Sequence, residues 1–118
     1  MAKSLLIISR QSPWSGPDAR EALDIVLAGG AFDLPIALLF LDDGVLQLAA
    51  GQNAKAVQQK DLSANLQALP MFGVEELFYC AESASNRGLG KLSLEEAQPL
   101  AAEHITALID RYDQVITL

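Results

Sequence analysis

Short, uninterrupted apolar runs recur along the chain, separated by polar or amphipathic segments. They cover residues 5–8, 34–41, 77–80 and 115–118. An apolar run without polar alternation is typical of a strand buried on both faces, as in parallel sheets. Parallel strands need long crossover connections, which are usually helices. The pattern therefore predicts an α/β fold with helices on both faces of a mostly parallel sheet.

The clearest helix begins after Ser15-Gly16-Pro17-Asp18, which has the Ser-x-x-Asp form of a capping box. Gly29-Gly30 is expected to end it. Further helices are predicted over residues 54–69 and 99–112, and a short strand over 92–97. The order predicts one Rossmann-like three-layer domain over residues 1–118, with about four to five strands. One apolar stripe at spacings of three and four marks the first helix: Ala19, Ala22, Leu23, Val26, Leu27 and Gly30.

Charge and cysteine content narrow the class of protein. Eight Lys and Arg against fifteen Asp and Glu give a net charge of −7, which disfavours direct binding of nucleic acid or an anionic membrane. A single cysteine excludes an internal disulfide. The apolar runs are shorter than the roughly 20 residues of a membrane-spanning helix. We expect a cytoplasmic protein.

The loops after the strands carry no recognisable metal or cofactor motif. Both Gly-x-Gly-x-x-Gly and the phosphate-binding Gly-x-x-x-x-Gly-Lys-Ser/Thr pattern are absent. Asp42 and Asp43 can together bind a hard cation, but a turn with Gly44 at positive φ is favoured because no third ligand is recognisable. His104, the only histidine, is expected to be structural and partly exposed. No cofactor and no metal are predicted.

Cys80 is the residue whose placement is most suggestive of chemistry. It closes a predicted strand and precedes residues 81–88, which can begin with a helical turn. A thiolate is favoured at a helix N-terminus with an arginine such as Arg87 nearby, and it can accept sulfur as a persulfide. Glu82 opposes a thiolate, and free cysteines often pack as small buried side chains. The residues alone favour inert packing, with sulfur acceptance at Cys80 assisted by Arg87 as the alternative.

An apolar stretch lies where a solvated connection is expected, over residues 45–52. Val45, Leu46 and Leu48 are its large apolar members. An exposed apolar patch usually marks an interface, so these residues are predicted to contact another subunit. A short extra helix packed on the sheet end is the alternative, and both can hold. Aspartate at Val45 and Leu46 is expected to disrupt assembly at little cost in stability.

Several short segments occur in a defined order within residues 3–118. They are Ser9-Arg10, residues 19–24, Asp43-Gly44-Val45, Gln47-Leu48, Gly51-Gln52, Cys80-Ala81-Glu82-Ser83 and Arg87-Gly88-Leu89. Together they resemble the DsrF/TusC subunits of the DsrE-like sulfur-relay family. The resemblance implies a Rossmann-like α/β domain that joins two paralogous subunits, of the DsrE/TusD and DsrH/TusB types, in a heterohexamer.

The resemblance also implies a function. The TusBCD form of such complexes relays persulfide sulfur, through a downstream acceptor protein, toward 2-thiolation of the tRNA wobble uridine; the DsrEFH form serves sulfur oxidation. The family's sulfur-accepting cysteine is attributed to the DsrE/TusD subunit. We therefore expect a supporting subunit that does not catalyse alone, with tRNA thiolation preferred over sulfur oxidation. The alternatives are a stand-alone thiol-dependent sulfurtransferase that forms a homo-oligomer and a small-ligand-binding module.

Overall fold

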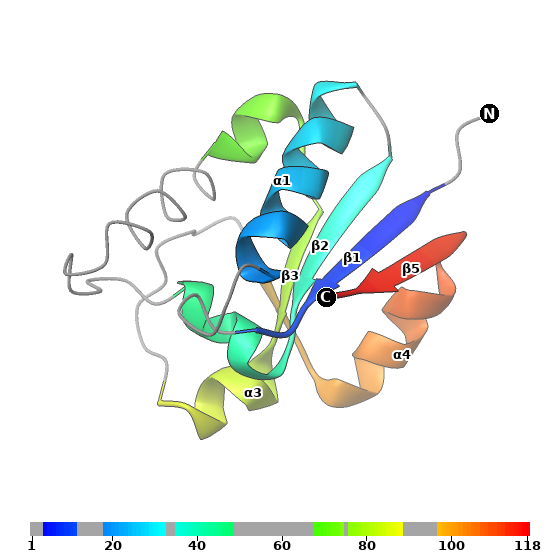
Figure 1. Cartoon of the computed structure of the whole chain (residues 1–118). Coiled ribbons are helices and arrows are strands. Elements are labelled where there is room, and N and C mark those ends of the chain that lie inside the picture. The colour runs from blue at the N-terminus through cyan, green and yellow to red at the C-terminus, as the bar shows by residue number, and fades with distance from the viewer. Residues whose placement is uncertain (1–3, 12–17, 33–34, 49–67, 75, 89–96) are drawn as a thin grey trace, which may run out of the picture.

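The fold is built on one parallel five-stranded sheet, in the order β4-β3-β2-β1-β5 (Figure 1). The structure is a computed structural model, and it describes residues 4–11, 18–32, 35–48, 68–74, 76–88 and 97–118. The strands are β1 (Leu5–Ser9), β2 (Ile36–Phe40), β3 (Leu77–Cys80), β4 (Gln98–Leu100) and β5 (Gln114–Thr117). This arrangement confirms the predicted α/β class.

The strands at the centre of the sheet are buried on both faces. β1 pairs with β2 from Leu5↔Ile36 to Ser9↔Phe40 and with β5 from Leu5↔Gln114 to Ile8↔Thr117. All residues of β2 are buried, which explains why its sequence reads as an apolar run without alternation. Polar side chains therefore begin only where these strands end.

One face of the sheet is covered by α1 (Asp18–Ala31) and by the 3₁₀ helix η1 (Asp42–Leu48). Leu23 and Val26 of α1 pack there against Ile7 of β1 and Leu38 of β2. The carboxyl end of this layer also includes Ala84 of α3 (Ala81–Asn86). This is the larger of the two cores.

The opposite face is covered by α4 (Ala102–Asp110). Ile105 and Leu108 of α4 pack against strand residues of this face, such as Leu6 and Leu39. Beyond α4, the Tyr112 hydroxyl donates a hydrogen bond of 2.9 Å to Glu76, which lies just before β3. Burial, this hydrogen bond and the charge of Glu76 raise the pKa of Tyr112 above its ordinary value, against the opposing charge of Arg111. None of the helices in the described ranges is both long and apolar enough to cross a bilayer.

Several predicted boundaries differ from the structure. α1 continues through Gly29-Gly30 to Ala31, so these glycines do not end the helix. A Cβ on Gly30 would lie 2.6 Å from Val74 and 2.8 Å from the Phe72 carbonyl oxygen, so glycine here permits close packing of α1 on the 3₁₀ helix η2 (Pro70–Phe72). The predicted helix over 54–69 lies mainly outside the described residues, and the last helix begins at Ala102 rather than at residue 99.

Val45 and Leu48, predicted as interface residues, are core residues of this chain. Both side chains are 0% exposed and pack in the core on the α1 face. They belong to η1, the short extra helix that was the alternative for this stretch. Apolar residues in a connection can be buried by their own domain as well as by a partner, and here their own sheet buries them. Leu46 is the only one of the three that is partly exposed.

This placement also reverses the expected cost of the aspartate substitutions. We expect Val45→Asp to lower the free energy of unfolding by about 4 kcal/mol or more, because it buries an unpaired charge. Leu46→Asp, at the partly exposed neighbouring position, is the matched control and should cost about 1 kcal/mol. Urea unfolding followed by circular dichroism measures both. A Val45→Asp variant as stable as Leu46→Asp would contradict the burial of Val45.

Candidate functional site at the carboxyl ends of the strands

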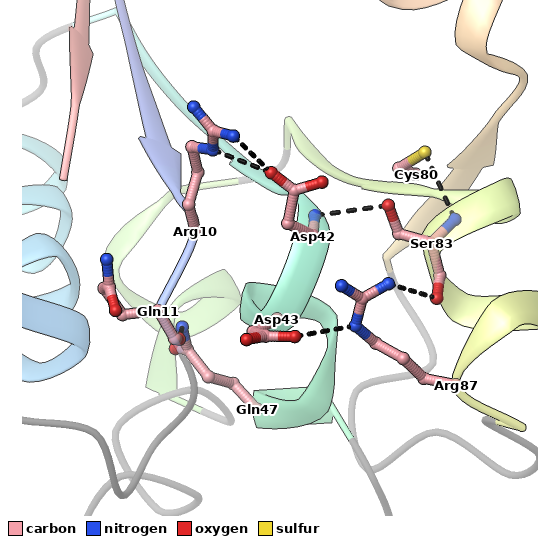
Figure 2. Close-up of polar contacts among 8 residues, drawn as sticks. All are labelled: Arg10, Gln11, Asp42, Asp43, Gln47, Cys80, Ser83 and Arg87. Atoms are coloured by element: carbon pink, nitrogen blue, oxygen red, sulfur yellow. Dashed lines mark hydrogen bonds and ion pairs between the residues drawn. The ribbon is translucent and has the colours of Figure 1, made fainter.

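The polar residues that follow β1, β2 and β3 meet at one edge of the sheet (Figure 2). Arg10 and Gln11 follow β1, Asp42 and Asp43 open η1 after β2, and Cys80 ends β3 directly before α3. In parallel α/β sheets, ligand binding and chemistry concentrate at this edge. Its geometry therefore decides which of the predicted site residues act together.

The chain turns sharply from β2 into η1. Asp42 has a positive φ of 51°, and its backbone N–H donates a hydrogen bond of 3.2 Å to the Ser83 hydroxyl of α3. The sequence predicts a positive φ at Gly44, whereas the structure has it at Asp42. Gly44 serves a different need, because a Cβ there would lie 1.9 Å from the carbonyl oxygen of Ser9. That carbonyl also accepts the Leu41 N–H at 3.0 Å, so the start of η1 is pressed against the end of β1.

The two aspartates pair with different arginines. Arg10 Nε lies 2.8 Å from Asp42 Oδ2, and Arg87 Nε lies 2.9 Å from Asp43 Oδ1. Figure 2 shows the Asp42 carboxylate joined to Arg10 and the Asp43 carboxylate joined to Arg87. Among the residues that the structure describes, no three His, Cys, Asp or Glu side chains form a group suited to a metal ion. Both pairs are partly exposed to solvent, so each contributes little to stability.

Cys80 lies at the junction of β3 and α3, with its side chain turned inward. It is the N-cap of α3, and its Sγ accepts a hydrogen bond of 3.4 Å from the Ser83 backbone N–H. The predicted helical turn after Cys80 is therefore present. The residue is only 4% exposed and belongs to the same core cluster as Ile105 and Leu108 of α4. A sulfur in this position contacts its own chain rather than solvent.

Arg87 is near Cys80 in sequence but serves other groups. Its guanidinium pairs with Asp43 and donates through Nη1 to the Ser83 carbonyl oxygen at 3.2 Å. It thereby links the last turn of α3 to the start of η1, and Figure 2 shows its guanidinium directed at these two groups. Stabilisation of the Cys80 sulfur by Arg87 is not among the described contacts of either residue. The helix N-terminus contacts this sulfur instead.

A buried, hydrogen-bonded glutamine side chain at the same end of the sheet was not predicted from the sequence. Gln47 is 3% exposed, and its Nε2 donates to the Ser9 hydroxyl at 2.7 Å and to the Gln11 carbonyl oxygen at 3.0 Å. A glutamine inside an otherwise apolar stretch was the available signal, since buried amides need hydrogen-bond partners. His104 lies elsewhere, exposed on α4, and takes no part in this arrangement.

The contact between Gly44 and β1 can be tested by adding one methyl group. We expect Gly44→Ala to lower the free energy of unfolding by about 3 kcal/mol, because the backbone of Ser9 cannot move away without disturbing the sheet. Gly73→Ala is the matched control: Gly73 has a φ of 83° but open space at its Cβ, so only about 1 kcal/mol of backbone strain is expected. Equal costs in urea unfolding would argue against the close approach.

The burial of Cys80 predicts slow alkylation. We expect iodoacetamide to modify native Cys80 at least about a hundredfold more slowly than the same thiol in urea, since reaction requires local opening. A chain with Cys80→Ser and Ser85→Cys is the control, because residue 85 is exposed on the same helix. Mass spectrometry over time gives both rates. Equal rates for the two native thiols would contradict an inward-facing sulfur.

Comparison with known proteins agrees with this fold. The crystal structure of the ychN protein from E. coli superimposes with a TM-score of 0.79 at 16% identity, covering 98% of this chain and 99% of that chain. At such low identity the likeness concerns the fold alone.

Sequence relatives carry the classification further. The chain is 64% identical over 119 residues to a TusC homolog from Pseudomonas aeruginosa, covering 100% of each chain. It is 36% identical over 96 residues to the intracellular sulfur oxidation protein DsrF from Allochromatium vinosum, covering 81% of this chain and 71% of that protein. A model of the DsrE/DsrF-like family matches residues 3–118. The chain therefore belongs to the DsrE/DsrF-like family.

Proposed function

We propose that this chain is a TusC-like subunit of a sulfur relay that serves tRNA thiolation. The observation that carries the proposal is the 64% identity to a TusC homolog over the full length of both chains. The likeness to the sulfur oxidation protein DsrF is lower and covers less of either chain. Thiolation of the tRNA wobble uridine is therefore preferred over sulfur oxidation as the pathway served.

The role of the chain within the relay is supporting rather than sulfur-carrying. A sulfur carrier must present its thiolate to an incoming persulfide, because transfer proceeds by attack of the thiolate on a sulfur atom. Cys80 is 4% exposed, packs under α4 and already caps α3. These contacts support a structural Cys80, with sulfur accepted by a paralogous subunit. They also weigh against a stand-alone sulfurtransferase that depends on this thiol.

The partners proposed are two paralogous chains of the TusD and TusB types. In this proposal the three subunits form a cytoplasmic heterohexamer, and a downstream protein accepts the sulfur and contacts tRNA. The net charge of −7 supports leaving RNA contact to another protein, since phosphate groups repel an acidic surface.

Gene deletion and complementation test the function. We expect deletion to reduce 2-thiolated wobble uridine in tRNA, and the wild-type gene and a Cys80→Ser variant to restore it to equal levels. Val45→Asp, which should strongly destabilise the chain, is the negative control. Mass spectrometry of digested tRNA measures the modification. Unchanged thiolation after deletion contradicts the proposed pathway, whereas failure of Cys80→Ser to restore it makes Cys80 a working sulfur carrier.

Assembly is tested separately by co-expression. An affinity tag on this chain should recover the TusD- and TusB-type proteins of the same organism together, at equal stoichiometry, with wild type and Cys80→Ser alike. Recovery of the tagged chain alone would contradict the proposed partners while leaving the thiolation result intact.

A further inference from the structure

Among the strands that the structure describes, β5 lies at one edge of the sheet and lacks the charged residues and prolines that often protect such edges. Its residues Gln114–Thr117 are all exposed, and they include neither a charged residue nor a proline. The opposite edge differs, because β4 contains Pro99, which has no N–H to offer another strand. Exposed edges of this kind are templates for pairing with another chain. Figure 1 shows β5 at the outer side of the sheet, beside β1.

The hydrogen bonds to β1 show which backbone groups of β5 remain for a partner. The Gln114 N–H donates to the Ser4 carbonyl at 3.1 Å, and the Leu118 N–H donates to the Ile8 carbonyl at 2.9 Å. Backbone groups alternate in direction along a strand, so residues 114, 116 and 118 face β1. The N–H and C=O groups of Val115 and Thr117 therefore point away from the sheet.

The side chains of β5 also leave apolar area exposed on both faces. Val115 is 37% exposed and pairs with Leu6 on the α4 face, whereas Ile116 is 42% exposed and pairs with Ile7 on the α1 face. A neighbouring strand with β-branched residues would cover both. The strand thus offers backbone groups and apolar side chains to the same partner.

We propose that β5 pairs in antiparallel orientation with β5 of a second copy of this chain, about a two-fold axis at Ile116. In this register Val115 lies opposite Thr117 of the second copy, and Ile116 lies opposite its own counterpart. The outward groups of Val115 and Thr117 then form about four backbone hydrogen bonds across the axis. Every cross-strand pair between residues 115 and 117 is β-branched, and the two sheets become one continuous sheet.

Charge favours this edge as the meeting point of two identical chains. Each copy carries a net charge of −7, so two copies repel one another wherever their acidic residues meet. Gln114–Thr117 bears no charge, and the adjacent Asp113 carboxylate already accepts hydrogen bonds from the N–H and hydroxyl of Ser4. The proposal concerns contact between two copies of this chain and does not depend on sulfur relay.

A proline at residue 117 tests the backbone part of the proposal. The Thr117 N–H faces outward, so Thr117→Pro removes a donor from the proposed contact without removing one from the β1–β5 pairing. We expect the full chain to show dimers in sedimentation velocity between about 1 and 200 µM, as for a small interface. Thr117→Pro should raise the dissociation constant at least about thirtyfold.

Thr117→Val keeps the N–H and is the matched control, expected to dimerise like wild type. A wild-type chain that stays monomeric over the whole range overturns the proposal. So does a folded Thr117→Pro variant that dimerises as wild type does. Circular dichroism shows whether that variant is folded.

Disulfide trapping tests the register and does not depend on the proline variant. In a Cys80→Ser background, Ile116→Cys places two thiols at a non-hydrogen-bonded pair with Cα atoms about 4.5 Å apart, within disulfide range. Val115→Cys is the control, because the two copies of residue 115 lie diagonally, beyond about 7 Å. We expect mild oxidation to give a covalent dimer for Ile116→Cys alone in non-reducing electrophoresis. No dimer for Ile116→Cys, or equal yields for the two variants, overturns the proposed register.

Discussion

Burial of β1 and β2 on both faces is the constraint on which the rest of the structure depends. Leu6, Ile7, Leu38 and Leu39 have almost no exposed surface, so neither strand can carry polar side chains along its length. Groups able to form hydrogen bonds or ion pairs are displaced to the carboxyl ends of the strands. The candidate site therefore lies at the carboxyl ends of the strands because apolar core residues occupy the rest of their length. Its polar residues must lie within a few positions of each strand end.

That organisation is achieved by short backbone links rather than by the exposed ion pairs. The Ser9 carbonyl oxygen accepts the Leu41 N–H, and the Asp42 N–H reaches the Ser83 hydroxyl, so β1, η1 and α3 are joined in sequence. The Cys80 sulfur completes this chain of contacts by accepting the Ser83 N–H. A thiol used in this way holds an element in place. This gives a physical reason for a buried cysteine at a position where sulfur chemistry is the first interpretation.

The sequence predicted the strands better than the connections between them. The bounds of Leu77–Cys80 are as expected because a doubly buried strand leaves a local signature in its composition. Hydrophobicity predicts Val45 and Leu48 as interface residues, but it indicates only that a residue is buried and not what buries it, which here is the chain's own core. The links of Gln47 to Ser9 and of Asp42 to Ser83 join residues 38 and 41 positions apart. Such links depend on the relative placement of segments, which local patterns do not encode.

The left-handed conformation of Asp42 has a consequence for how this position can vary among related chains. Only glycine, asparagine and aspartate adopt a φ near 51° readily, whereas β-branched residues are strongly disfavoured there. Aspartate alone among these three also supplies a carboxylate for Arg10. Replacement by asparagine or glycine would preserve the turn and lose the negative charge. Related chains can therefore differ in charge at the carboxyl ends of the strands while they keep the same backbone turn. The backbone limits the choice of residue first, and the surface charge is selected within that limit.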